Sequence, residues 1–104
     1  MMDYQLVIKF WRKSLGDEAF LATIEQELKQ ALGDAAELEG YDTSPKEINL
    51  FVLVRDPRQA FRRIKDVLEG HGLQHGVSAA FRLVGGASFT SLWPPRATRK
   101  FTLP

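Results

Sequence analysis

The run Ile48–Val54 is the most apolar stretch of the chain, with six hydrophobic residues among seven. A short run of this kind, rich in branched and aromatic side chains, is typical of a strand that has neighbours on both sides. Turn-forming residues bound it, because Thr43–Pro45 precede it and Asp56-Pro57 follow it. We therefore predict a central strand over residues 46–55, around which the other elements are arranged.

Two segments have the spacing of amphipathic helices. From about residue 17 to residue 32, hydrophobic residues recur at intervals of three and four. Gly33 follows this first helix, at a position where a left-handed turn ends many helices. The second helix begins after the central strand, because Asp56-Pro57 supplies both a capping side chain and a proline for the first helical position. It ends at Gly70 or Gly72.

Four further segments are predicted to be strands, from their branched, aromatic or alternating residues and the turn residues around them. They are Tyr4–Trp11, a weakly strand-like edge segment over 35–43, Val77–Val84 and Ala87–Trp93, the last two joined by Gly85-Gly86. The order strand, helix, strand, strand, helix, strand resembles the ferredoxin-like fold over residues 4–84. That resemblance implies an α+β sandwich with two helices on one face of an antiparallel sheet, which a fifth strand extends in a C-terminal hairpin.

The length of 104 residues suits a single domain, which we place at residues 1–95, followed by a basic C-terminal tail at 96–104. The absence of cysteine excludes a disulfide framework, cysteine-ligated metals and thiol catalysis. No apolar run approaches the roughly 18 residues that span a bilayer, and the N-terminus lacks the features of a signal peptide. We therefore expect a cytoplasmic protein of bacterial type that does not bind a membrane.

The formal net charge of +1 conceals three unlike regions. Residues 1–13 carry +2, residues 14–47 carry −7 from nine acids and two bases, and residues 48–104 carry +6 from nine bases and three acids. Five of those bases end the central strand or belong to the second helix: Arg55, Arg58, Arg62, Arg63 and Lys65. They form either a solvated helix surface or a basic surface that holds phosphate or an acidic protein.

The sheet face that the helices leave uncovered, called the open face below, carries large hydrophobic side chains. If alternate residues of the first and central strands point at the helices, the residues between them point away. An apolar cluster of this size is uncommon on an uncovered sheet, so we expect contact with another protein; cover by the C-terminal tail or a long loop is the alternative. The predicted partner- or ligand-binding residues share this face: Val7, Trp11, Asn49, Phe51, Leu53 and Arg82.

Side chains suited to catalysis or metal binding are few. The two histidines, His71 and His75, lie four residues apart in a glycine-rich segment. The glycines indicate a loop rather than a helix, so we interpret both histidines as solvent-facing and predict no metal site. Carboxylate pairs such as Glu37 and Glu39 fall where we expect solvated surface. We predict no catalytic residue and no cofactor, and favour a role other than that of an enzyme.

The ferredoxin-like fold hosts many unrelated functions and does not by itself identify one. Three segments, Asn49–Val52, Asp56-Pro57 and Ser91–Pro94, resemble small bacterial α/β proteins of uncharacterised function. Some proteins of this size and build are immunity proteins that neutralise toxins. We therefore hypothesise an interaction domain that forms a homodimer or binds a partner protein through the open face, a toxin included.

Two alternatives stay open. The first is a small-molecule-binding or catalytic domain with a cavity on the open face, surrounded by four residues: Trp11, Asn49, Phe51 and Arg82. The second is RNA binding through Lys9, Arg55 and the basic second helix. The acidic region at 14–47 counts against this second alternative, so nucleic acid is not an expected partner.

Overall fold

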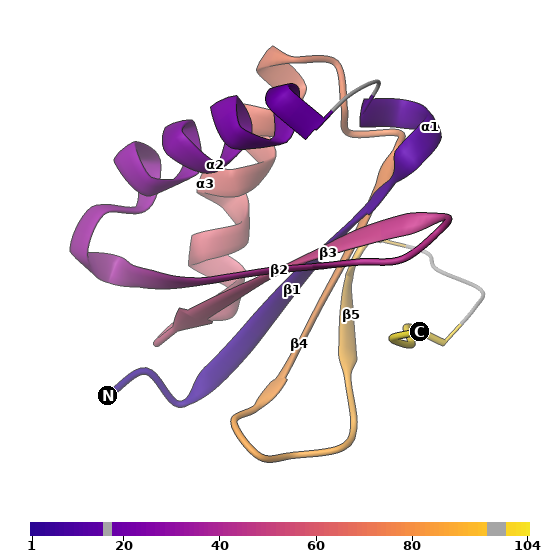
Figure 1. Cartoon of the computed structure of the whole chain (residues 1–104). Coiled ribbons are helices and arrows are strands. Elements are labelled where there is room, and N and C mark those ends of the chain that lie inside the picture. Colours follow the sequence, from indigo (N-terminus) through magenta and orange to yellow (C-terminus); the bar gives the residue numbers. More distant parts are fainter. Residues whose placement is uncertain (16–17, 96–99) are drawn as a thin grey trace.

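The computed structural model describes residues 1–15, 18–95 and 100–104, which form an α+β fold (Figure 1). Its elements are β1 (Tyr4–Trp11), α1 (Arg12–Leu15), α2 (Glu18–Leu32), a short 3₁₀ helix η1 (Gly33–Ala35), β2 (Ala36–Thr43), β3 (Glu47–Val54), α3 (Pro57–Gly70), β4 (Val77–Leu83) and β5 (Thr90–Trp93). The predicted α+β class is confirmed, with two long helices and a five-stranded antiparallel sheet in the described residues.

The sheet is arranged around β3 and β1. The strands pair in the order β2-β3-β1-β4-β5, and each neighbouring pair is antiparallel. β3 therefore has partners on both sides, as the most apolar run predicts, and it is one residue shorter at each end than the prediction. β2 lies at one edge, where its exposed acidic residues face solvent.

The main core lies between the sheet and the two long helices, which Figure 1 shows on the same side of the sheet. Alternate residues of β1 and β3 supply one half of this core, and the hydrophobic stripes of α2 and α3 supply the other. Its buried members include Leu6, Ile8, Phe10, Leu50, Val52, Leu21, Ile24, Leu28, Ile64 and Leu68. Burial of each such side chain contributes about 1.5–3 kcal/mol, so this layer holds the helices on the sheet.

The start of α3 agrees with the sequence prediction. The backbone N–H of Gln59 donates to Oδ1 of Asp56 at 3.1 Å. Pro57 occupies the first helical position, where its missing N–H removes no intrahelical bond. The predicted cap is therefore confirmed, and it fixes the point at which the chain turns from β3 into the helix.

The end of α3 is set by backbone geometry at Gly72, whose φ is +71°. The N–H of Leu73 donates to the carbonyl of Leu68 at 2.9 Å. The N–H of Gly72 donates to the carbonyl of Glu69 at 3.0 Å. Together these bonds form a Schellman motif, which pairs two carbonyl groups at the helix end. Leu73 is buried in the core, so the motif also directs the chain toward β4.

Some local features differ from the prediction. α1 is an additional helix, and its four residues are too few to show a helical period in the sequence. β5 starts three residues later than predicted, because a longer loop follows the turn at Gly85, whose φ is +81°. Residue 17, where the first long helix is predicted to begin, and residues 96–99 of the predicted tail lie outside the described residues.

Candidate functional site

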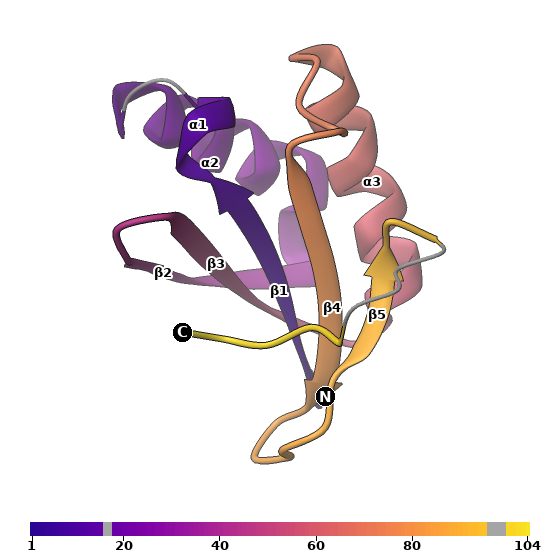
Figure 2. The same cartoon turned by 90° about the vertical axis from the view of Figure 1, so that its right-hand side faces the viewer.

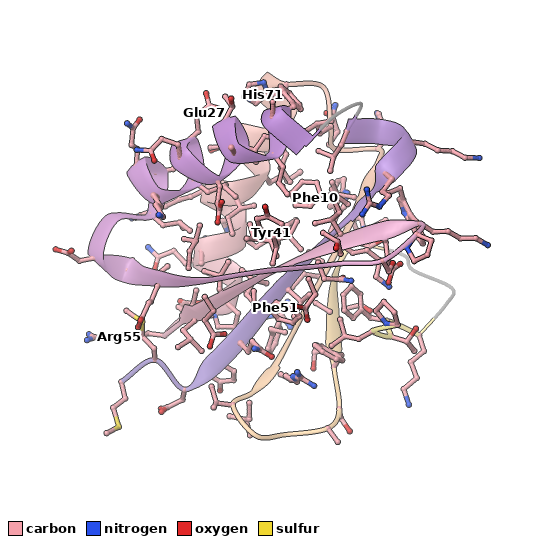
Figure 3. All side chains as sticks on the ribbon, viewed as in Figure 1. Phe10, Glu27, Tyr41, Phe51, Arg55 and His71 are labelled. Atoms are coloured by element: carbon pink, nitrogen blue, oxygen red, sulfur yellow. The ribbon has the colours of Figure 1, made fainter. Side chains whose placement is uncertain are left out.

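The residues of the open face follow from the strand register. Val7 of β1 lies opposite Phe51 of β3 and Ala80 of β4, so these three side chains share one face. Figure 3 shows Phe51 on the side of the sheet away from the helices. Two residues further along β1, Lys9 lies opposite Asn49. The open face therefore has an apolar row and, beside it, a polar row.

The C-terminal segment Lys100–Pro104 lies across this face (Figure 2). Phe101 is 8% exposed and packs against Val7 and Ala80, both fully buried. Phe89, from the loop before β5, lies beside it, with the two ring centroids 5.0 Å apart. Cover by the C-terminal tail, an alternative that the sequence leaves open, is therefore what the structure shows for the centre of the open face.

Lys9 and Glu47 form a buried ion pair on the open face. Nζ of Lys9 lies 3.4 Å from Oε2 of Glu47, and the two side chains are 9% and 11% exposed. The same Nζ donates to the carbonyl of Thr102 at 2.5 Å and lies 4.7 Å from the centre of the Phe101 ring. Lysine is rarely buried without such partners. A carboxylate, a carbonyl and an aromatic ring thus surround the ammonium group and tie the C-terminal segment to β1.

Asn49 completes the polar row, and one of its atoms is unsatisfied. Its Nδ2 donates to Oε1 of Glu47 at 3.4 Å, and the residue is 1% exposed. Its Oδ1 is buried and has no hydrogen-bond partner in the part of the chain that the structure describes. Buried polar atoms are nearly always paired in folded proteins. A hydrogen bond from a donor group of a bound molecule to this oxygen would therefore be favourable.

Two cavities border the C-terminal segment on the open face. The one toward β5 has a volume of about 420 Å³ and is lined by residues that include Lys9, Trp11, Ser78, Ser91 and Phe101. The one toward β2 has a volume of about 530 Å³ and is lined by residues that include Tyr41, Asp42, Asn49 and Phe51. Leu103 and Pro104 line both cavities, so the segment occupies the middle of the face and leaves space on either side of it.

The four residues predicted to surround one ligand cavity are on the open face but do not meet in one place. Trp11 lines the cavity toward β5 and is 42% exposed, whereas Asn49 and Phe51 line the cavity toward β2. Nε of Arg82 donates to Oε1 of Gln5 at 2.9 Å, and Arg82 lines neither cavity. The remaining two predicted residues differ in exposure, since Val7 is buried beneath Phe101 and Leu53 is half-buried.

Sequence reasoning missed the Lys9–Glu47 pair and Phe101. The pair has a signal in the sequence, because antiparallel pairing of the first and third strands brings Lys9 diagonally opposite Glu47 on one face. Phe101 has none, because a segment of five residues has too few positions for a period to appear. Its place depends on a contact between residues more than ninety positions apart in the chain.

The predicted basic surface is divided between two sides of α3. Arg55 and Arg63 line a separate cavity of about 330 Å³ beside the end of α2. Arg58 stacks 5.5 Å from the ring centre of Phe81, and Lys65 pairs with Glu69 at 3.4 Å; Arg62 is exposed. Lys9, which the RNA-binding hypothesis includes, is buried and paired, so it does not offer its charge to a phosphate.

The interpretation of both histidines as solvent-facing is wrong for His71. Its Nε2 contacts Oε2 of Glu27 on α2 (Figure 3). Its ring packs edge-on against that of Phe20, with the two ring centroids 5.1 Å apart. The contact links the end of α3 to the neighbouring helix, which explains why the side chain is partly buried. His75 is exposed. Within the described ranges, no group of three histidine or acidic side chains is placed to hold a metal ion.

Comparison of the chain with protein-family models, with curated proteins and with solved structures gave no match. Among the described residues, no helix is long and apolar enough to cross a membrane. The function is therefore inferred from the geometry of the open face.

Proposed function

We propose that this chain is a small non-enzymatic interaction domain that binds another protein, or a second copy of itself, through the open face. The observation that supports it most is the hydrophobic surface there: Trp11 is 42% exposed, and Phe51 and Leu53 are half-buried, with the C-terminal segment in place. An antiparallel sheet with helices on one side normally presents a polar second face. A second face with apolar side chains favours contact with a partner.

The packing of Lys100–Pro104 is consistent with this proposal. Phe101 packs in one cluster with Val7 and Ala80, and a backbone carbonyl of the segment accepts a hydrogen bond from the Lys9 ammonium group. Side-chain and backbone groups of a protein chain thus fit this face. A larger partner would extend the contact outward to Trp11. A toxin-binding, immunity-type role would be one form of this function.

We propose a ferredoxin-like topology for the same domain. The strand order β2-β3-β1-β4 supports it, with α2 between β1 and β2 and α3 between β3 and β4 in the chain. β5 extends the sheet beyond β4. In this topology the helices leave one sheet face free, which is where the proposed binding surface lies.

Sedimentation velocity at rising concentration tests the proposed function. Phe101→Ala removes the ring that covers Val7 and Ala80, so we expect this full-length variant to self-associate at high micromolar concentration. Adding Phe51→Ser should reverse the association, whereas adding Asp56→Ala, which changes the N-cap of α3 and no strand residue, should not. A folded Phe101→Ala chain that remains monomeric throughout would exclude a second copy as the partner. If that chain also fails to bind a peptide with the sequence of Lys100–Pro104, the proposal is contradicted.

A second candidate function is small-molecule binding in the cavity toward β5. Ser78 and Ser91 line this cavity together with Trp11 and Phe101. Cavities with apolar walls and few polar groups are the usual ligand sites. Thermal-shift screening with a broad metabolite set checks it. A ligand should raise the Tm of the unmodified chain but not that of Ser91→Phe, which fills the cavity. Equal stabilisation of both chains, or stabilisation of neither, would exclude this candidate.

A further inference from the structure

We infer that the open face recognises an extended, mostly apolar peptide segment of a partner protein, with an aromatic residue where Phe101 lies, and that Lys100–Pro104 is an intramolecular competitor for that site. The inference rests on the proposed function, because it names the kind of partner that the open face binds. Four features of the described residues carry it.

The first feature is that the contacts of the open face with the C-terminal segment depend little on the sequence of that segment. The Phe101 ring is buried, whereas the side chains of Lys100 and Thr102 are exposed. Lys9 contacts the carbonyl oxygen of Thr102, a group that every peptide has. A different segment with one aromatic side chain at this position would make the same two contacts.

The second feature is the incomplete fit of the segment. Asn49 Oδ1 stays buried and unpaired among the described residues, although the cavity that Asn49 lines also contains Leu103 and Pro104. Proline has no backbone N–H to donate, so the last residue of the segment offers that oxygen no backbone hydrogen bond. A partner segment with a donor at this place would satisfy Asn49 and bind better than the chain's own residues.

The third feature is the space beside the segment. Cavities of about 420 and 530 Å³ border it on the two sides, and Leu103 is only half-buried between them. Larger side chains than those of the C-terminal segment would therefore fit. Both hollows are partly open to solvent, so the segment lies on the surface of the sheet with room on either side for a bulkier occupant.

The fourth feature is the charge at the β2 end of the site. Asp42 lines the cavity toward β2 and lies opposite Asn49 in the register. Pro104 lines the same cavity, so a partner segment that continues past its position passes the Asp42 carboxylate, and a lysine or arginine directly after the apolar part suits it.

Isothermal titration calorimetry with synthetic peptides tests the inference. The probe has the sequence of Lys100–Pro104 with one added lysine at its C-terminal end. We expect saturable binding to full-length Phe101→Ala and about tenfold weaker binding to the unmodified chain, since its own segment occupies the site most of the time. A peptide with alanine in place of phenylalanine should not bind, and one with glutamate in place of the added lysine should bind more weakly.

Two further variants serve as controls. Thr102→Ala keeps the backbone carbonyl and changes an exposed side chain, so it should bind the probe as weakly as the unmodified chain does. Phe101→Leu, which keeps apolar volume, replaces Phe101→Ala if circular dichroism shows the alanine variant to be unfolded.

The outcomes separate this inference from the proposed function. Tighter binding to the Phe101 variants, lost on addition of Phe51→Ser, supports both. Equal affinity of the unmodified and variant chains for the peptide overturns the inference that Lys100–Pro104 competes for the site. Absence of peptide binding, together with self-association of Phe101→Ala that depends on Phe51, overturns the peptide partner and leaves the proposed function intact. Absence of both binding and association overturns both.

Discussion

At the scale of single residues, Lys9 is the side chain whose environment departs furthest from its usual one. Its ammonium group is removed from solvent and held between Glu47 and the carbonyl of Thr102. Removal of one member of a buried ion pair destabilises the fold by more than the intact pair stabilises it, because the remaining charge stays in a poorly solvated site. Lys9 therefore links stability to the position of the C-terminal segment.

Replacement of Lys9 by methionine should lower the free energy of unfolding by about 3 kcal/mol, because it leaves the Glu47 carboxylate buried without its cation. The double variant Lys9→Met/Glu47→Met should recover much of that loss. Urea denaturation measures both values.

Lys65→Met is the matched control for this change. Lys65 pairs with Glu69 four residues along α3 on a partly exposed surface, so its loss should cost less than about 1 kcal/mol. Similar costs for Lys65→Met and Lys9→Met would show that the ion pair on the open face is not effectively buried.

The contacts of a residue can be predicted from the sequence more readily when its partner is near in the chain than when its partner is distant. The Asp56 cap is readable because its partner, Gln59, is three positions away. The ion pair between Lys9 and Glu47 requires a strand register that the sequence does not state. The burial of Phe101 requires the folded sheet itself, because the ring packs against Val7 at the other end of the chain.

At the scale of elements, α3 has well-defined signals at both ends. Asp56→Ala should remove the N-terminal cap and lower stability by about 1 kcal/mol, which corresponds to roughly 4–8 °C in Tm for a domain of this size. Thermal unfolding checks the effect, and Asp66→Ala, an exposed position inside the same helix, should change Tm little. Association and peptide binding should be the same as in the unmodified chain. If either is abolished at unchanged Tm, Asp56 belongs to a binding site.

Gly72→Ala should destabilise the chain by about 1–2 kcal/mol, because φ at this position is +71° and a Cβ is unfavourable in the left-handed region. Gly70→Ala is a close control, since a Cβ added at either glycine would meet no atom of a more distant residue within 4 Å, and φ at Gly70 is not positive. It should be neutral or slightly stabilising, by no more than about 1 kcal/mol. Chemical denaturation of both variants separates the cost of the positive φ from that of the added methyl group. Equal losses in the free energy of unfolding would mean that the Schellman motif does not determine the helix end.

Helices and strands could be predicted where the sequence has a hydrophobic pattern or a capping residue. Those without either signal could not. β3 and α3 match their predicted bounds closely because an apolar run and a capped amphipathic stripe define them. α1 is too short for a period, and the late start of β5 depends on the loop after Gly85 rather than on strand-forming residues.

At the scale of the whole molecule, the chain forms two layers of apolar contact on one sheet. The helices cover one face with the main core, and Lys100–Pro104 covers the centre of the other (Figures 1 and 2). In β1 and β3, hydrophobic residues occupy both sets of alternate positions, which is enough to predict that both faces of the sheet are apolar. It does not predict what covers the second face, because that depends on where the chain runs after β5.

In the proposed mode of binding, the C-terminal segment occupies the open face and leaves it when a partner segment binds. Since the chain has no cysteine, Thr102→Cys provides one site for a nitroxide label, at a side chain that is exposed. Asp66→Cys, at an exposed position of α3 and away from the segment, provides a reference.

Electron paramagnetic resonance of the label at position 102, with and without saturating probe peptide, reports whether the segment leaves the face. We expect restricted label motion in the free chain, fast motion after the peptide is added, and no change at position 66. Fast motion at position 102 in the free chain, or restricted motion that persists when the peptide is bound, would contradict the proposed mode of binding.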